Sequence, residues 1–347
     1  MRAWAAGLAV MAGMAVPFCM AAPADADAST KTVAYVTNSS GTVSMVDGAG
    51  KIVGDPISVG ELPLHVAVTP NGKTAYVTNN ESNDVSVIDT ATGKVIGDPI
   101  HVGDYPLGVA ATNSKVYVTN MGSDGTNNVS VIDTATNKVT AVPDHDGQVP
   151  WDVAASPDGT HIYITNSGSS NVSVIDPQTD QVTATISTGG SPRGVAVSPD
   201  GKHIYVADSD SGNVSVIDSQ TNTVTGTVPL GRDAVPQGLT VAPDGKHIYV
   251  ADKGSSAVSV IDTATNKVDG APISVGVDAS PMDVAVTPDG EHVYVTDSGT
   301  DDVSMIDTKT HSVSASTPGF VVPTGVAIAP AQQPAPAAVK PAPQAAQ

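Results

Sequence analysis

One short sequence pattern returns seven times along this chain, and no other feature constrains the fold as strongly. One copy reads AYVTNNESNDVSVID over residues 75–89, and a later copy reads IYVADSDSGNVSVID over residues 204–218. The tyrosines of the copies are 41 to 46 residues apart: Tyr35, Tyr76, Tyr117, Tyr163, Tyr205, Tyr249 and Tyr294. Self-similarity at a fixed period indicates repeated supersecondary units that stack on one another.

Each repeat contains four short apolar runs rich in Val, Ile, Thr and Tyr, separated by Gly, Asn, Asp and Pro. Around Tyr205 the runs lie within 193–198, 203–208, 214–218 and 224–228, and a Pro-Asp-Gly turn follows the first. Such runs predict β-strands, and the period matches a four-stranded propeller blade. We therefore predict an all-β fold, a seven-bladed β-propeller of four-stranded antiparallel blades.

The two ends of the repeat region complement each other. The chain enters the pattern at a second-strand sequence, KTVAYVTN at 31–38, with no inner strand before it. It leaves the pattern at an inner-strand sequence, VPTGVAIAP at 322–330, with nothing after it. We predict that the first blade consists of residues 32–57 plus the inner strand 324–330, so that the ring closes by pairing N-terminal strands with a C-terminal strand.

Three segments are expected from the composition along the chain. Residues 1–28 have one positive charge, an apolar stretch and an Ala-Asp-Ala sequence, which together predict a signal peptide cut near Ser29. A retained membrane anchor is the alternative. Residues 29–330 form the predicted propeller, and 331–347 form a Pro/Ala/Gln-rich tail that we expect to be disordered. The one cysteine, Cys19, falls in the first segment, so no disulfide is expected in the exported chain.

The motifs of the repeat resemble those of a known family. YVTN occurs at 35–38, 76–79 and 117–120, with YITN at 163–166 and YVAD or YVTD in later copies. Together with VSVID and PDG, these words resemble the YVTN family of β-propeller repeats of secreted and surface proteins. The wider group includes lactonase-like propellers and the propeller domains of certain oxidoreductases. This resemblance implies the seven-bladed fold but not one function, because such folds carry many activities.

The net charge of −20 argues against a nucleic-acid partner, since no Lys/Arg cluster is present. Much of the acidity comes from aspartates in turns, where Asp bonds the backbone. No haem-attachment, nucleotide-loop or zinc-protease motif occurs, and we expect no cofactor. We also expect a monomer without a transmembrane segment after removal of the signal peptide.

Candidate binding residues gather in the links that lead into each inner strand. Each link ends in a proline, and outside the blade tyrosines the rare aromatic and arginine residues fall in or beside these links. Trp, Tyr and Arg commonly anchor binding surfaces. The predicted ligand or partner face comprises His65, Tyr105, Trp151, Asp152, Arg193, Arg232, Met282 and Asp283. The alternative is that rare residues collect where the repeat is loosest.

Metal sites are not expected from the sequence. His65, Asp152 and Asp283 could form a metal or acid-base set, but they lie on separate blades without a positioned partner. Four histidines share one place after the Pro-Asp-Gly turn, or its variant, and are expected at a strand edge: His161, His203, His247 and His292. The single histidines, among them His311, carry no pattern.

Three functional classes follow. We favour a non-catalytic secreted or cell-envelope propeller that serves as a binding or scaffold module for a protein, glycan or small ligand. One alternative is an enzyme with a site in the central channel, such as a lactonase-like hydrolase or a lyase. The other is an accessory to periplasmic redox enzymes.

Overall fold

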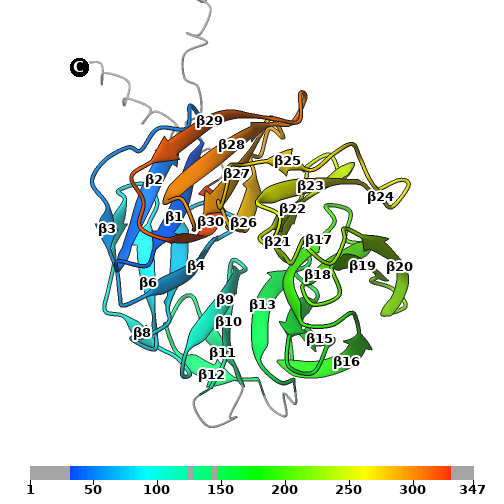
Figure 1. The fold of residues 1–347 in the computed structure, drawn as a ribbon. Helices are drawn as coiled ribbons and strands as arrows, with labels where there is room; N and C mark the ends of the chain where they lie inside the picture. Colours follow the sequence, from blue (N-terminus) through cyan, green and yellow to red (C-terminus); the bar gives the residue numbers. More distant parts are fainter. Residues whose placement is uncertain (1–31, 123–127, 143–146, 330–347) are drawn as a thin grey trace, which may run out of the picture. The chain divides into compact units, whose positions relative to one another are not determined.

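The protein is described by a computed structural model that covers residues 32–122, 128–142 and 147–329. These residues form thirty β-strands and no helix, arranged as seven sheets around a ring (Figure 1). The predicted seven-bladed, all-β fold is confirmed. The signal-peptide prediction for 1–28 and the tail prediction for 331–347 fall outside the described residues.

Within each blade the strands follow one another from the channel outward, and we number the blades 1 to 7 by their second strands. The inner strands are β30 (Pro323–Ala329) of blade 1, β4 (Pro63–Val68), β9 (Pro106–Ala111), β13 (Pro150–Ala155), β17 (Pro192–Val197), β21 (Pro236–Val241) and β26 (Pro281–Val286). The second strands are β1 (Val33–Asn38), β5 (Thr74–Asn79), β10 (Lys115–Asn120), β14 (Ile162–Asn166), β18 (His203–Asp208), β22 (His247–Asp252) and β27 (His292–Asp297).

The third strands carry the VSVID sequence, and the outer strands vary most. The third strands are β2 (Thr42–Asp47), β6 (Asp84–Asp89), β11 (Asn128–Asp133), β15 (Asn171–Asp176), β19 (Asn213–Asp218), β23 (Ala257–Asp262) and β28 (Asp302–Asp307). The outer strands are β3 (Ile57–Ser58), β7 (Lys94–Val95), β8 (Ile100–His101), β12 (Val139–Ala141), β16 (Gln181–Ser187), β20 (Thr223–Pro229), β24 (Lys267–Val268), β25 (Ile273–Ser274) and β29 (Ser312–Pro318). In blades 2 and 6 the outer position is divided between two short strands, β7 with β8 and β24 with β25.

The ring closes through blade 1, as the two ends of the repeat predict. Strand β30 pairs antiparallel with β1, and Tyr35 lies opposite Ala327. The hydroxyl oxygens of Thr37 and Thr324 lie 2.9 Å apart across this pair. Blade 1 thus joins three N-terminal strands to one C-terminal strand, in the order β3-β2-β1-β30.

The repeated tyrosine holds neighbouring blades together. Six of the seven are buried at 0–1% exposure and Tyr76 at 3%, within the apolar clusters that fill the seams between blades. Several hydroxyls reach the next blade: Tyr294 donates to the Asp47 carbonyl at 2.6 Å, and Tyr117 to the Asp180 carboxylate at 2.9 Å. Each tyrosine therefore contributes apolar burial to a seam, and some add a hydrogen bond across it.

The threonine of YVTN links the same seams near the channel. Thr78 Oγ1 accepts the amide of His65 in its own blade at 3.2 Å and donates to the carbonyl of Leu107 in the next blade at 2.6 Å. Thr119 bonds Gly108 and Trp151 in the same way. The YVTN and VSVID motifs recur because their residues form the contacts within and between blades. Their recurrence therefore does not indicate a ligand-binding site.

Two faces of the ring result from the strand order. The proline links and the turns between second and third strands lie at one end of the strands, since Ser39 and Ser209 bond the carbonyls of Val321 and Ser191. The Pro-Asp-Gly turns and the turns after VSVID lie at the other end, where Thr263 and Thr308 bond Lys246 and Glu291. In the described part of the chain, no helix has the length and apolar character needed to cross a membrane.

Candidate functional site

The seven inner strands begin with the same distorted geometry, which brings the residues after the proline to the channel. The residue before each proline has φ between 42° and 54°, as at Tyr105 and Val149. A shift of register follows each proline, and this β-bulge displaces the next two residues from regular pairing. All seven links share the strain, so it belongs to the fold and not to one site.

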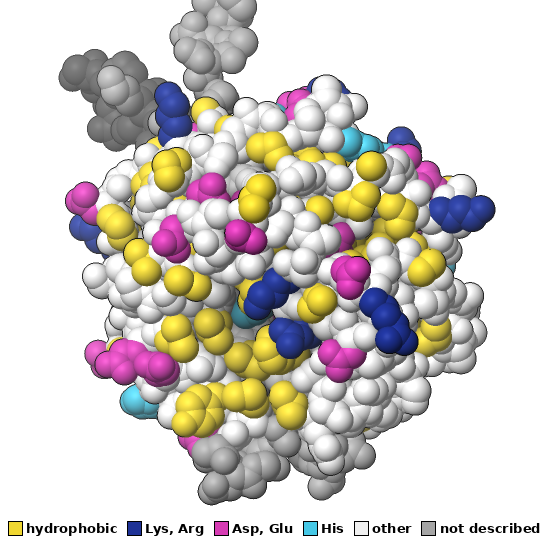
Figure 2. All heavy atoms as spheres, in the orientation of Figure 1, with side chains coloured by type: hydrophobic (Ala, Val, Ile, Leu, Met, Phe, Trp, Pro, Cys, Tyr) yellow, Lys and Arg dark blue, Asp and Glu magenta, His cyan; other side chains and the backbone are white. Residues whose placement is uncertain are grey.

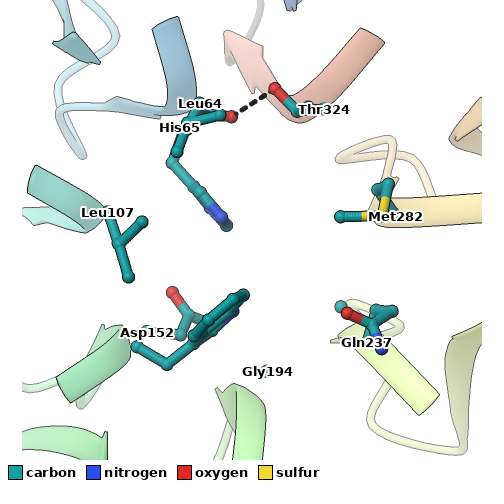
Figure 3. A pocket seen from close by; sticks show the side chains of 10 residues that line it. Leu64, His65, Leu107, Asp152, Gly194, Gln237, Met282 and Thr324 are labelled. Carbon is teal, nitrogen blue, oxygen red and sulfur yellow. Dashed lines mark hydrogen bonds between the residues drawn. The ribbon is translucent and has the colours of Figure 1, made fainter. Parts of the chain in front are cut away.

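The residues after the prolines line a cavity of about 200 Å³ at the mouth of the channel. Figure 2 shows a hollow near the centre of this face, with hydrophobic and basic side chains around it. Figure 3 shows His65, Leu107 and Met282 converging on the cavity from different blades. The full lining is Leu64, His65, Leu107, Trp151, Asp152, Gly194, Gln237, Gly238, Met282 and Thr324.

Trp151 and Arg193 form a stacked pair beside this cavity. The guanidinium carbon of Arg193 lies 4.3 Å from the centre of the Trp151 ring, which is a cation-π contact. Arg193 also donates from one terminal nitrogen to Gln237 Oε1 at 2.7 Å. Its buried Nε has no hydrogen-bond partner in the described structure. A buried donor without a partner is uncommon, and it suits a ligand that brings an acceptor oxygen.

The two carboxylates near the mouth are engaged by the backbone. Asp152 accepts the amides of Val153 at 2.8 Å and of Val195 in the next blade at 3.1 Å. Asp283 accepts those of Val284 and Val326 in the same manner. Each carboxylate therefore holds two inner strands together at their bulges.

Burial dominates the electrostatics of these two carboxylates. It raises the pKa of Asp152 to about 6, where the nearby His65 acts against the rise and Asp283 adds to it. Burial also raises the pKa of Asp283, again with His65 acting in the opposite direction. Asp152 therefore exchanges its proton at a pH about two units above that of an ordinary aspartate.

His65, Asp152 and Asp283 are not brought into a ligand set. In the segments that the structure covers, the one group of three such side chains with all ligand atoms within 4.8 Å lies elsewhere. The His65 ring points into the cavity (Figure 3), and no hydrogen bond from it is formed within the described segments. It is free to contact a ligand.

The remaining predicted residues lie apart from the cavity. Tyr105 precedes its proline, is 40% exposed and does not line the mouth. Arg232 is exposed in the link before β21 and does not line it either. Of the eight predicted residues, four line the cavity (His65, Trp151, Asp152 and Met282), Arg193 stacks against it, and Asp283 supports it.

Sequence reasoning missed Leu64, Leu107, Gln237 and Thr324 as lining residues. The signal was available, because each directly follows a proline of the repeated link. These common residue types did not stand out from the repeat, whereas the rare Trp151 did.

The family model described as "Lactonase, 7-bladed beta-propeller" matches residues 111–237 of this chain. The resemblance to lactonase-like seven-bladed propellers is confirmed. No curated protein matches the chain.

Several solved structures share the fold. The hydrazine synthase of Kuenenia stuttgartiensis is 27% identical with a TM-score of 0.69, covering 79% of this chain and 92% of that one. The periplasmic gluconolactonase PpgL of Pseudomonas aeruginosa is 19% identical with a TM-score of 0.71, covering 87% and 100%. The dihydro-heme d1 dehydrogenase NirN is 16% identical with a TM-score of 0.63, covering 85% and 74%. The last two are too distant to indicate more than the fold.

Proposed function

We propose that this propeller is a non-catalytic binding module that takes a small ligand at the channel mouth. The observation that carries the proposal is the cavity itself, with an apolar wall from Leu64, Leu107 and Met282 and a stacked Trp151–Arg193 pair at its side. Binding sites commonly combine such apolar linings with a few placed polar groups.

The chemistry of the lining indicates the ligand class. The cavity of about 200 Å³ suits a single ring. The Trp151 face favours a flat or sugar-like ring, and the unpartnered Nε of Arg193 favours a carboxylate or another acceptor oxygen. We therefore propose a ring-containing ligand with an acidic or strongly polar oxygen group.

Tryptophan fluorescence provides the test. The sequence has two tryptophans, Trp4 and Trp151, so a chain that begins at residue 29 reports on the mouth alone. We would titrate it with aromatic carboxylates, sugar acids and short oligosaccharides. We expect a saturable change for one class, weakened about tenfold or more by Arg193→Ala and unaffected by the matched exposed variant Arg232→Ala. Equal binding by the Arg193→Ala variant would contradict the proposal.

A hydrolase at the same mouth is the second candidate. It is supported by the pKa of Asp152, which burial raises to about 6, within the range of a general acid or base. The lactonase family match supports the same candidate. Incubation with sugar lactones, followed by NMR, tests it: turnover that disappears in Asp152→Asn would favour the enzyme over the binding module.

We also propose that the chain is exported and acts in the periplasm or cell envelope. The signal-like residues 1–28 support this, as does the likeness to a periplasmic gluconolactonase. Amino-terminal sequencing of the protein from cell fractions tests it. We expect a start near Ser29 in the envelope or medium, whereas an intact Met1 in the cytoplasm would contradict export.

A further inference from the structure

A second cluster of ligating side chains lies at the seam between blades 6 and 7, at the strand end opposite the channel mouth. His247 begins β22 after the turn at Pro243, and Asp269 directly follows β24 in the same blade. His311 comes from the next blade, in the turn between β28 and β29. Blades 6 and 7 are neighbours in the ring (Figure 1).

The three side chains converge. His247 Nε2 lies 3.8 Å from Asp269 Oδ2, and the two imidazole rings meet edge-on with their centres 5.7 Å apart. One ligand atom from each of the three lies within 4.8 Å of the other two. Within residues 32–122, 128–142 and 147–329, this is the one group of three with that property.

The repeat provides an internal control for this cluster. His247 occupies a place where blades 4, 5 and 7 also have histidine, so it alone indicates nothing. His311, however, stands where four other blades have Asn or Asp at the same left-handed φ: Asn137, Asp180, Asn222 and Asn266. Histidine is also accommodated at this φ, which is 49° at His311, so the change from Asn or Asp adds an imidazole without altering the turn.

Asp269 also departs from the repeat. The equivalent residues Thr183, Thr225 and Ser314 each donate a hydroxyl hydrogen bond to a carbonyl of the third strand, at 3.0–3.2 Å. Asp269 lacks that hydroxyl. Two departures from the repeat, Asp269 and His311, therefore lie beside the same repeated histidine, His247.

The surroundings favour a cation. The groove beside His247 has a volume of about 510 Å³ and includes Asp244, Asp289 and Lys309. Lys309 pairs with Glu291 at 2.8 Å, which offsets its positive charge.

We propose that His247, Asp269 and His311 bind one divalent transition-metal ion, of the Zn²⁺ or Cu²⁺ class, that links blades 6 and 7. Two imidazoles and one carboxylate are a ligand set that such ions take, with metal-ligand distances of about 2.0–2.2 Å. Binding at these distances requires the three ligand atoms, which lie within 4.8 Å of one another, to move closer together. Imidazole and carboxylate groups bind metal in their deprotonated forms, so acidification weakens binding.

The test uses the full chain, free of any polyhistidine tag. Calorimetric titration with Zn²⁺ is expected to show one equivalent bound at pH 7.5 and weaker binding at pH 5.5. Electron paramagnetic resonance with Cu²⁺ is expected to show nitrogen ligands. Saturation with Zn²⁺ is expected to raise Tm by several degrees, because the ion binds the folded ring.

Two variants restore the residues of the repeat and should therefore fold: His311→Asn and Asp269→Thr. Each is expected to weaken Zn²⁺ binding by at least about tenfold, since even the loss of an outer partner of a metal ligand costs about 10–100-fold. The matched control is His203→Asn. His203 occupies the same repeat position as His247, but its blade has Thr225 in place of Asp269 and the next blade has Asn266 in place of His311. Undiminished binding in His311→Asn, a loss in His203→Asn of the same size, or no binding of Zn²⁺ at about 100 µM would overturn the proposal.

Discussion

The last residue of the second strand offers a sharp test of how burial sets the stability of this propeller. Blades 1 to 4 have asparagine there, and blades 5 to 7 have Asp208, Asp252 and Asp297, which are 0–1% exposed. In the asparagine blades the amide donates to a third-strand serine, as Asn166 does to Ser173 at 2.9 Å. In blade 5 the serine donates instead, from Ser215 to Asp208 at 2.6 Å.

Burial raises the pKa of all three carboxyl groups, to about 6 for Asp208 and about 7 for Asp252 and Asp297. The folded state thus holds a proton that the unfolded chain releases near pH 3.8. Stability from these groups is full below that pH and is lost as the pH rises toward 6 or 7. At about 1.4 kcal/mol per pH unit, the loss reaches about 3 kcal/mol for Asp208 and about 4 kcal/mol for each of the others.

Replacing these residues with asparagine removes that loss. In blades 5 and 6 it also keeps a hydrogen bond to serine, since Ser215 and Ser259 bond Asp208 and Asp252 in the wild type. We expect each Asp→Asn variant to be at least about 1 kcal/mol more stable than the wild type at pH 8, and its advantage to be smaller by about 2–3 kcal/mol at pH 4.5. The triple variant should lose most of the decline in stability between pH 5 and pH 8. Urea unfolding and Tm at several pH values measure this.

The reverse change is the matched control. Asn166→Asp places a carboxyl group in an equivalent buried site of blade 4, where the wild type has none. It should destabilise the protein at pH 8 and have little effect at pH 4.5. If the triple variant retained the wild-type decline in stability with pH, burial of these three aspartates would not be its cause.

Further predictions concern closure and the seams. Deletion of residues 320–347 should lower Tm severely and expose the chain to protease, because it removes β30 from its pairing with β1. Deletion of 332–347 should leave both Tm and protease resistance unchanged. Equal Tm values for the two truncated chains would contradict closure of the ring through blade 1. Thr119→Val should cost about 1–3 kcal/mol in urea unfolding, because it leaves the Gly108 amide and the Trp151 carbonyl without their partner, and the exposed Thr92→Val should cost less. Acidification below pH 4 should destabilise the wild type, because hydrogen bonds from Thr136 and Thr221 lower the pKa of Asp133 and Asp218, and this loss should persist in the triple variant above.

The fold could be predicted from the sequence almost completely, for a physical reason. A blade cannot bury both faces alone, so a repeated tyrosine period fixes both the unit and the need to stack. The incomplete first and last repeats then fix the closure, and β30 ends within one residue of the predicted strand. The outer strands were predicted less completely. The sequence did not indicate that two short strands, β7 and β8, share the outer position of blade 2.

The candidate site was harder to predict from the sequence than the fold. A difference of one residue in position relative to the proline decides which side chain lines the cavity. Tyr105 precedes its proline and faces solvent, whereas Trp151 follows its own proline and lines the mouth. The role of Asp152 depends on the bulge of the next blade, which brings the Val195 amide within 3.1 Å. A contact between blades cannot be inferred from either repeat alone.

Packing also explains why so few of the mouth positions carry functional groups. The second residue after the proline is glycine in four blades, and a Cβ at Gly194 would lie 2.4 Å from the Gln237 carbonyl oxygen. A Cβ at Gly238 would lie 2.4 Å from Asp283 Oδ1, so the carboxylate occupies the space that the glycine leaves. Close approach of the inner strands therefore excludes side chains at these places, and the carboxylates beside them serve the packing.

A repeat protein thus separates structural from functional residues within its own sequence. A residue type found in nearly every blade, such as the seam tyrosine or the YVTN threonine, has a contact that explains it in each copy. Residues that depart from the repeat need another explanation. In the described part of the chain two sets of them lie together: the Trp151–Arg193 pair at the channel mouth and the His247–Asp269–His311 cluster at the opposite strand end. Because different blades and opposite faces carry them, a variant at one place should leave binding at the other intact.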